Sequence, residues 1–444
     1  MKSVTFRGGV HPLQSEHHGK PLSDSCAITV MPAPDVLVIP MARVTGAPCT
    51  PLVKKGDIVR MGQRIGESQA FVSAPIHSSV SGTVVAVEPR PHPTGKSHVI
   101  SVVIKNDRLD TPDEGIHPCE DVEKLTGAEI IGIIRDKGIV GMGGATFPTH
   151  VKLTIPKGKT VDTLIANAAE CEPYLTADDR LLQERALSVV SGIKLALRAL
   201  GIERALIGVE GNKPRAIKAL RDAAVGTAIE VKPLRVKYPQ GGEKQLIWAL
   251  TRREVPSGGL PADAGCVVIN VGTLYAIHEA VVLGKPLIER VVTVTGGGVR
   301  NPANLLVRIG TSFHACVEFC GGKTDDAAKI LSGGPMMGVA QFSDAVPVIA
   351  GTSGIIVLSG EEAHVPPATA CIHCGRCFRV CPIRLQPYLI SDAVDTGDTA
   401  RAAQLHTMDC VECGACTYIC PARRQLLQNI RIGKNRIRGA ALKK

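Results

Sequence analysis

At 444 residues the chain is too long for a single core, so we expect roughly two to four domains. Its 44% hydrophobic and 21% charged residues are typical of a globular chain and exclude a disordered one. The net charge is +10, and residues 421–444 carry eight basic and no acidic residues. Because none of the 13 aromatic residues lies in this basic tail, we expect no nucleic-acid partner.

The N-terminal segment, MKSVTFRGGVHPLQSEHHGK, has no apolar region of the kind that a signal peptide contains. The longest uncharged apolar stretches, at 264–277 and 345–360, are too short or too rich in glycine to span a bilayer. We therefore predict a soluble, cytoplasmic chain. In that compartment its fifteen cysteines favour metal ligands over disulfides.

Residues 40–105 alternate short Val and Ile runs with turn signals, the pattern of a small all-β unit. The segments LVKKGDIVRMGQRIGE (52–67) and APIHSSVSGTV (74–84) resemble the biotinyl/lipoyl hammerhead. In that family a lysine on the hairpin carries the cofactor, but residues 68–83 contain no lysine. We predict an unmodified hammerhead over residues 1–110 with a structural or docking role.

Between about residues 120 and 290 the pattern is first helical and then alternates between strands and helices. This alternation indicates an α/β domain, placed at 111–290. We predict helices at 128–137 and 181–200, and short buried strands at 163–168, 205–209 and 267–271.

Residues 291–350 return to β character. The segments TVTGGGV (293–299) and LVRIGT (306–311) resemble a soluble-ligand-binding β-grasp domain, which we place at 291–360. Pro366 and Pro367 then mark a linker within the start of a last domain, 361–444. The predicted fold class is α/β plus β in four domains, the last one helical.

A glycine-rich loop occupies residues 139–152, IVGMGGATFPTHVK. It is not a dinucleotide-binding fingerprint, because the third glycine would fall at Thr146 and a helix rather than a strand precedes it. It is not a Walker A loop either, since it lacks the G-K-[ST] ending. Consecutive glycines bare their N–H groups and Lys152 adds charge, which suits a phosphate. Alone, the loop is explained equally well as a plain turn.

Two cysteine runs repeat with a 39-residue offset, CIHCGRCFRVCP (371–382) and CVECGACTYICP (410–421). Both read C-x2-C-x2-C-x3-C-P, in which the fourth cysteine ligates the other cluster of a pair. A zinc site would instead use paired C-x2-C knuckles. We predict two [4Fe–4S] clusters, cluster one held by Cys371, Cys374, Cys377 and Cys420, and cluster two held by Cys410, Cys413, Cys416 and Cys381.

Outside these runs, Cys316 and Cys320 are interpreted as buried small apolar side chains. The basic tail after the second run suits an anionic membrane surface or an acidic protein partner. A solvated terminal helix explains the tail equally well.

Three further motifs follow the glycine-rich loop in order: NAAECEP (167–173), YPQGGEK (238–244) and NVGTL (270–274). With the loop, they resemble the flavin-binding subunit of NADH–quinone oxidoreductase, although Met142 and Thr146 stand where that family has an arginine and a glycine. The resemblance implies that Phe147, Glu172 and Glu243 lie on the nicotinamide side of the site. It implies FMN contacts at Gly141, Gly143, Gly144, Lys152, Asn167, Glu170, Asn270 and Thr273.

The segment FRGGVHP (6–12), the hammerhead, the flavin domain, the β-grasp domain and the cysteine module together resemble the C subunit of the Rnf ion-translocating complexes. The resemblance implies a peripheral protein on the cytoplasmic side of the inner membrane, with the ferredoxin-like B subunit of the complex as partner. Electrons would pass between ferredoxin-derived clusters, FMN and NAD(H), since only a flavin exchanges both hydrides and single electrons. Two alternatives remain: a cobalamin reductase with the same flavin and cluster parts, and a flavin-free electron carrier.

Overall fold

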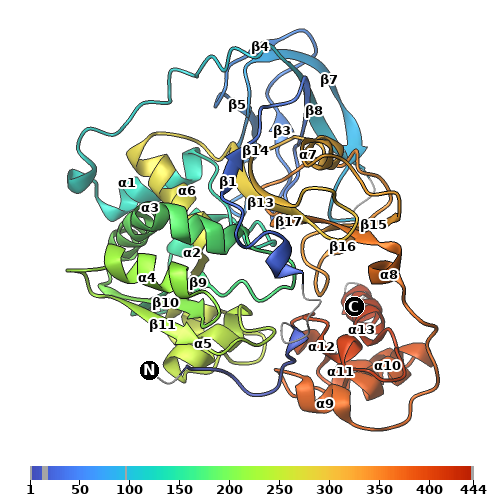
Figure 1. The fold of residues 1–444 in the computed structure, drawn as a ribbon. Helices are drawn as coiled ribbons and strands as arrows, with labels where there is room; N and C mark the ends of the chain where they lie inside the picture. The colour runs from blue at the N-terminus through green and yellow to red at the C-terminus, as the bar shows by residue number, and fades with distance from the viewer. Residues whose placement is uncertain (1–2, 13–18, 96–97, 442–444) are drawn as a thin grey trace.

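The computed structural model describes residues 3–12, 19–95 and 98–441, which form four units (Figure 1). The blue hammerhead and the yellow-to-orange β-grasp sheet lie together, and the green α/β domain lies beside them. The orange-to-red cysteine module lies at the end of the molecule opposite the hammerhead. Among the described residues, no helix combines the length and the apolar character needed to cross a membrane.

The hammerhead is all-β, as predicted, and contains two antiparallel sheets. Its core is formed by alternate residues of the strands, including Leu37, Ile39, Val102 and Ile104. One sheet has the order β2 (Val36–Pro40), β8 (His98–Asn106), β7 (Gly82–Pro91), β4 (Ile58–Val59), and the other has the order β3 (Thr50–Pro51), β5 (Arg64–Glu67), β6 (Ile76–His77).

The α/β domain contains a four-stranded parallel sheet, and its predicted strands are confirmed to within one residue. Helices α1 (Gly127–Asp136), α3 (Ala177–Leu200), α4 (Pro214–Ala223) and α6 (Val271–Val282) pack in its main core with the sheet. The sheet order is β11 (Ile229–Leu234), β10 (Arg204–Glu210), β9 (Thr163–Ala168), β12 (Cys266–Asn270).

The β-grasp sheet takes in a strand from far outside its predicted bounds. Strand β1 (Ile28–Val30) pairs in parallel with β14 (Ala303–Arg308). Helix α7 (Phe313–Phe319) buries Cys316 in the apolar core beside Cys320, which confirms the prediction for both cysteines. The remaining strands follow β14 in the order β13 (Glu289–Thr295), β17 (Gly354–Ser359), β15 (Ala327–Ser332), β16 (Val339–Gln341).

The cysteine module is helical, as predicted, and its basic tail forms α13 (Leu426–Ala441). Several tail charges bind inside the module: Arg431 and Lys434 both contact Glu412, at 3.0 and 2.8 Å. Lys443 and Lys444 lie outside the described residues. The other helices are α9 (Arg376–Val380), α10 (Pro387–Asp395), α11 (Thr399–Gln404) and α12 (Ala415–Tyr418).

Candidate functional site

Two asparagines lie side by side at the carboxyl ends of neighbouring parallel strands, where α/β sheets bind their ligands. Asn167 on β9 is in register with Asn270 on β12. The Asn167 amide donates to Gly241 O at 2.9 Å. The Asn270 side chain caps α6 by accepting from Gly272 N at 2.9 Å, and its amide donates to Asp178. Both amides are thereby held in fixed orientations.

The glycine-rich loop covers this sheet edge. Met142 N donates to the Thr273 hydroxyl at 2.9 Å, which ties the loop to the first turn of α6. Gly143, Gly144 and Ala145 are exposed, and their N–H groups donate to no other residue in the described part of the chain. Gly144 has a φ of 111°, a conformation that favours glycine. The loop therefore presents free N–H donors next to the two asparagines.

Hydrogen bonds connect the glycine-rich loop to the β-grasp domain and to the hammerhead. The buried Arg290 guanidinium donates to Met142 O at 3.1 Å and to Ala350 O. Burial lowers the pKa of Arg290 to about 10, so it stays charged at neutral pH. The Thr146 hydroxyl accepts from Val44 N at 2.8 Å, which links the loop to the hammerhead.

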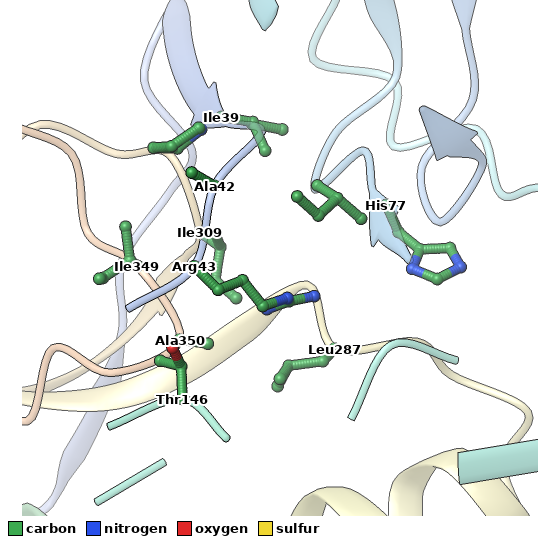
Figure 2. A pocket seen from close by; sticks show the side chains of 11 residues that line it. Ile39, Ala42, Arg43, His77, Thr146, Leu287, Ile309, Ile349 and Ala350 are labelled. Carbon is green, nitrogen blue, oxygen red and sulfur yellow. The ribbon is translucent and has the colours of Figure 1, made fainter. Parts of the chain in front are cut away.

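Behind Thr146 lies a small cavity between the hammerhead, the loop and the β-grasp sheet (Figure 2). Arg43 crosses it and donates to Pro75 O and Gly138 O, at 2.8 and 3.2 Å. Thr146 is thus part of a joint between three units.

The structure brings together two predicted residues from distant motifs. Lys152, on α2 (Thr149–Leu153), places its ammonium 2.9 Å from the carboxylate of Glu243, the first residue of α5 (Glu243–Thr251). The same ammonium donates to Val268 O at 3.1 Å. Both side chains remain partly exposed. The glycine-rich loop, the two asparagines at the strand ends and this Lys152–Glu243 pair are here called the cradle.

Two residues predicted to contact FMN lie beneath the surface instead. Thr273 is fully buried under the glycine-rich loop. Glu170 is also buried, and its carboxylate accepts from Asp178 N at 2.9 Å at the start of α3 while lying 3.5 Å from the Lys213 ammonium. These contacts show that the two residues support the cradle from below. Glu170 also explains why α3 begins before the predicted residue 181, because it supplies a cap from outside the helix.

Glu172, predicted on the nicotinamide side, accepts from Met336 N and Met337 N, each at 2.9 Å. It therefore contacts the loop between β15 and β16 of the β-grasp sheet. Burial raises the pKa of Glu172 to about 7. The carboxylate that accepts from the first turn of the next helix is that of Glu170. Phe147 is half-buried, and its carbonyl accepts from Gly141 N at 2.8 Å, which closes the glycine-rich loop.

The eight repeated cysteines surround two hollows in a crossed arrangement. In both runs a backbone N–H approaches a sulfur: His373 N lies 3.5 Å from Cys371 Sγ, and Glu412 N lies 3.4 Å from Cys410 Sγ. Cys371, Cys374, Cys377 and Cys420 line the first hollow, and Cys381, Cys410, Cys413 and Cys416 line the second.

The donor set of each hollow fits a [4Fe–4S] cluster, which is held by four thiolates and tuned by hydrogen bonds to sulfur. His373 and Glu412, two residues after the first cysteine of each run, both have positive φ values, 54° and 55°. This shared turn aims the backbone N–H back at the sulfur. Burial raises the pKa of Cys413 to about 12, so its thiolate forms with metal binding and proton release.

Sequence reasoning missed several residues that hold the site. Asp178, Lys213 and Arg290 act through side chains whose partners are distant in sequence, and no local pattern marks them. Tyr238 lay inside the recognised YPQGGEK motif and could have been singled out. Its hydroxyl donates to Cys413 O at 2.7 Å, which joins the α/β domain to the second hollow.

Four family models match the chain in the predicted order. They are the RnfC barrel sandwich hybrid domain at 4–109, the Nuo51 FMN-binding domain at 134–279, the SLBB domain at 291–340 and a 4Fe-4S dicluster domain at 370–423. These matches confirm the predicted fold class and give the two predicted cofactor types.

Relatives match over almost the full chain. The C subunit of the Na⁺-translocating ferredoxin:NAD⁺ oxidoreductase complex of Acetobacterium woodii is 50% identical over 98% of both chains. The proton-translocating counterpart of Clostridium ljungdahlii is 49% identical over 87% of this chain and 84% of its own. The C subunit of the ion-translocating oxidoreductase complex of Rhodobacter capsulatus is 41% identical over 92% and 78%.

Among solved structures, an NAD⁺-reducing [NiFe]-hydrogenase in the H2-reduced state superimposes with a TM-score of 0.51. It is 20% identical, over 73% of this chain and 63% of that one, and shows similarity of fold alone.

Proposed function

Because the chain belongs to the RnfC family, the C subunits of the ion-translocating ferredoxin:NAD⁺ oxidoreductase complexes, we propose that it exchanges electrons between NAD(H) and the rest of such a complex. It is an electron-transfer subunit of a multi-subunit oxidoreductase. We place it peripherally on the cytoplasmic side of the inner membrane, with the ferredoxin-like B subunit as its direct partner and ferredoxin as the indirect donor.

FMN supplies the chemistry that links hydride transfer to single-electron transfer. Its phosphate would lie by the free N–H groups of Gly143 and Gly144, close to the first turn of α6 that Asn270 caps. Gly141, Lys152 and Asn167 border the same space. Glu170 and Thr273 serve it indirectly by holding α3 and the loop.

The dinucleotide would enter on the side of Phe147 and the Lys152–Glu243 pair. Glu243 and Glu172 would orient it through hydrogen bonds, because hydride transfer needs close positioning rather than a protein acid. Since Glu172 also holds the 333–338 loop, binding on this side would involve the β-grasp sheet.

The surroundings of the two hollows support an order in which electrons would pass through the two clusters. Cluster one would lie beside the surface, where Ile372 is 66% exposed and Arg376 and Arg379 are also exposed. Cluster two would lie next to the α/β domain, because Cys413 packs with Tyr238 and Cys171. Electrons from an acidic, ferredoxin-like partner would therefore enter at cluster one and leave cluster two for the flavin.

The crossed grouping of eight cysteines, in one chain with an FMN-type cradle, carries this proposal. The test is anaerobic purification followed by iron, acid-labile sulfide and flavin analysis. We expect about eight iron atoms, about eight sulfides and one FMN per chain. NADH should bleach the flavin absorbance. A chain that binds both clusters but no flavin would contradict the proposal and favour the simple electron carrier.

A further inference from the structure

The residues of the FRGGVHP motif do not belong to the cradle described above. They lie between the α/β domain, which carries the cradle, and the cysteine module. Residues 4–10, here called the N-terminal strap, run beside the segment 233–240 of the α/β domain, and Figure 1 shows this dark blue segment leading toward the cysteine module. Val10 and Tyr238 exchange both backbone hydrogen bonds, at 2.8 and 2.9 Å. The Lys237 ammonium donates to Phe6 O at 2.9 Å.

The strap also reaches the loop that carries a ligand of cluster two. Gly9 N donates to Val380 O at 2.7 Å, one residue before Cys381. A Cβ atom at Gly8 would lie 2.9 Å from Cys381 O, and one at Gly9 would lie 2.5 Å from Tyr238 O. Both glycines have positive φ values, 79° and 81°. The paired glycines therefore allow three backbone segments to approach closely.

Tyr238 makes the second connection. Its side chain is 1% exposed, and its hydroxyl donates to Cys413 O at 2.7 Å. Three residues further along, Gly241 accepts from the Asn167 amide at 2.9 Å and donates to Cys171 Sγ at 3.3 Å. One short segment thus contacts both the second hollow and the strand-end asparagine of the cradle.

We propose that Tyr238 and the N-terminal strap position cluster two against the flavin for electron transfer. The inference rests on the proposed function. For each NAD⁺ reduced, two electrons cross this joint one at a time, and one proton joins them to complete the hydride. A misplacement of about 1 Å can slow a position-dependent step by up to about a hundredfold. The strap and Tyr238 hold the backbone at two of the four cluster-two ligands, Cys381 and Cys413, so they have a direct effect on rate.

The experiment compares Tyr238→Phe with Tyr174→Phe in the full chain loaded with both clusters and flavin. Tyr174 is a matched control because its hydroxyl makes a 2.7 Å hydrogen bond to Glu362, between the α/β domain and the end of the β-grasp domain. Anaerobic stopped-flow mixing with NADH follows flavin bleaching, and rapid-freeze EPR follows cluster reduction. Redox titration gives the potential of each cluster.

We expect Tyr238→Phe to bleach its flavin at the wild-type rate and to reduce cluster two about tenfold more slowly, because Cys413 O loses a buried donor. The potential of cluster two should fall while that of cluster one stays constant. Tyr174→Phe should match the wild type. An unchanged rate and potential in Tyr238→Phe, or equal slowing in both variants, would overturn the proposal.

Lys237→Met tests the strap separately, because it removes the bond to Phe6 O and leaves the Tyr238 hydroxyl in place. Hydrogen exchange at Gly9 should become faster and the reduction of cluster two slower. Faster exchange with unchanged electron transfer would remove the strap from the proposal. A wild-type chain without flavin or clusters would instead contradict the proposed function, so the two failures are distinguishable.

Discussion

Glu210 ends β10 with a carboxyl group that is 0% exposed, and neither of its oxygens has a hydrogen-bond partner among the described residues. Burial raises the pKa of Glu210 to about 7, although the nearby Lys20 and Lys213 act in the opposite direction. A carboxyl of an unfolded chain has a pKa near 4.5. The folded state therefore binds this proton more tightly, and its stability falls as the pH rises from about 4.5 to about 7.

Glu210→Gln keeps the shape of the protonated acid and cannot ionise. We expect this variant to be more stable than the wild type at pH 8, by up to a few kcal/mol, with the gap closing toward pH 5. Denaturant unfolding of the full chain at several pH values measures the difference. Glu361→Gln, at an exposed carboxylate on α8 (Gly360–Ala363), is the control and should show no such trend. A gap that does not vary with pH would contradict the assignment.

For single residues, the sequence predicts the structural role of a side chain well when its contact partner is close along the chain. The Thr126–Glu129 capping box at the start of α1 has a readable spacing. Glu170 has no such signal, because its partners are the first turn of α3 and Lys213, 43 residues away. Glu172 likewise has no local signal for its structural role, because its partners Met336 and Met337 are 164 and 165 residues away.

At the scale of elements, the two cysteine runs form a repeated unit in which the fourth cysteine of each run lines the hollow of the other run. Cys381, which ends the first run, lines the hollow of the second run. We expect Cys381→Ser to disturb cluster two and to leave cluster one intact. EPR of the reduced variant distinguishes the two clusters, and Cys420→Ser, the equivalent change in the second run, should show the opposite pattern. Loss of cluster one alone in Cys381→Ser would contradict the crossing.

Strands were predictable where burial on both faces makes them continuous apolar runs. Strands β9 and β10 meet this condition inside a parallel sheet covered by helices, and β12 meets it at the edge of the sheet, where its residues 266–269 are still buried. Strand β1 does not, because only three residues, 28–30, pair with a partner more than 270 positions away. No local pattern in so short a segment indicates which sheet it will join.

For the molecule as a whole, the order of the motifs predicted the order of the units, but it gave no information on how the units touch. The basic tail illustrates this limit, because Arg431 and Lys434 bind Glu412 within the module, whereas Arg423, Arg436 and Arg438 are exposed. The exposed basic residues at the first hollow, Arg376 and Arg379, are better placed to meet an acidic partner.

We expect the double change Arg376→Gln and Arg379→Gln to slow cluster reduction by a reduced acidic ferredoxin-type donor by about tenfold at low ionic strength, because attraction between opposite charges speeds the encounter. NADH oxidation with an artificial acceptor should stay constant. The control pair, Lys194→Gln and Arg215→Gln, removes the same charge from exposed positions on α3 and α4. Stopped-flow mixing at several salt concentrations decides, and equal slowing by both pairs would contradict a local docking surface.

The N-terminal strap has a consequence for the timing of synthesis. Gly9 is translated about 370 residues before Val380, and at roughly 5–20 residues per second that interval lasts about 20–75 s. During this time the hammerhead, the α/β domain and the β-grasp core can each form around local contacts. The joint between flavin and clusters can close only when the cysteine module has emerged from the ribosome. Electron transfer across this joint would therefore begin only after Gly9 and Val380, which are translated at widely separated times, have met.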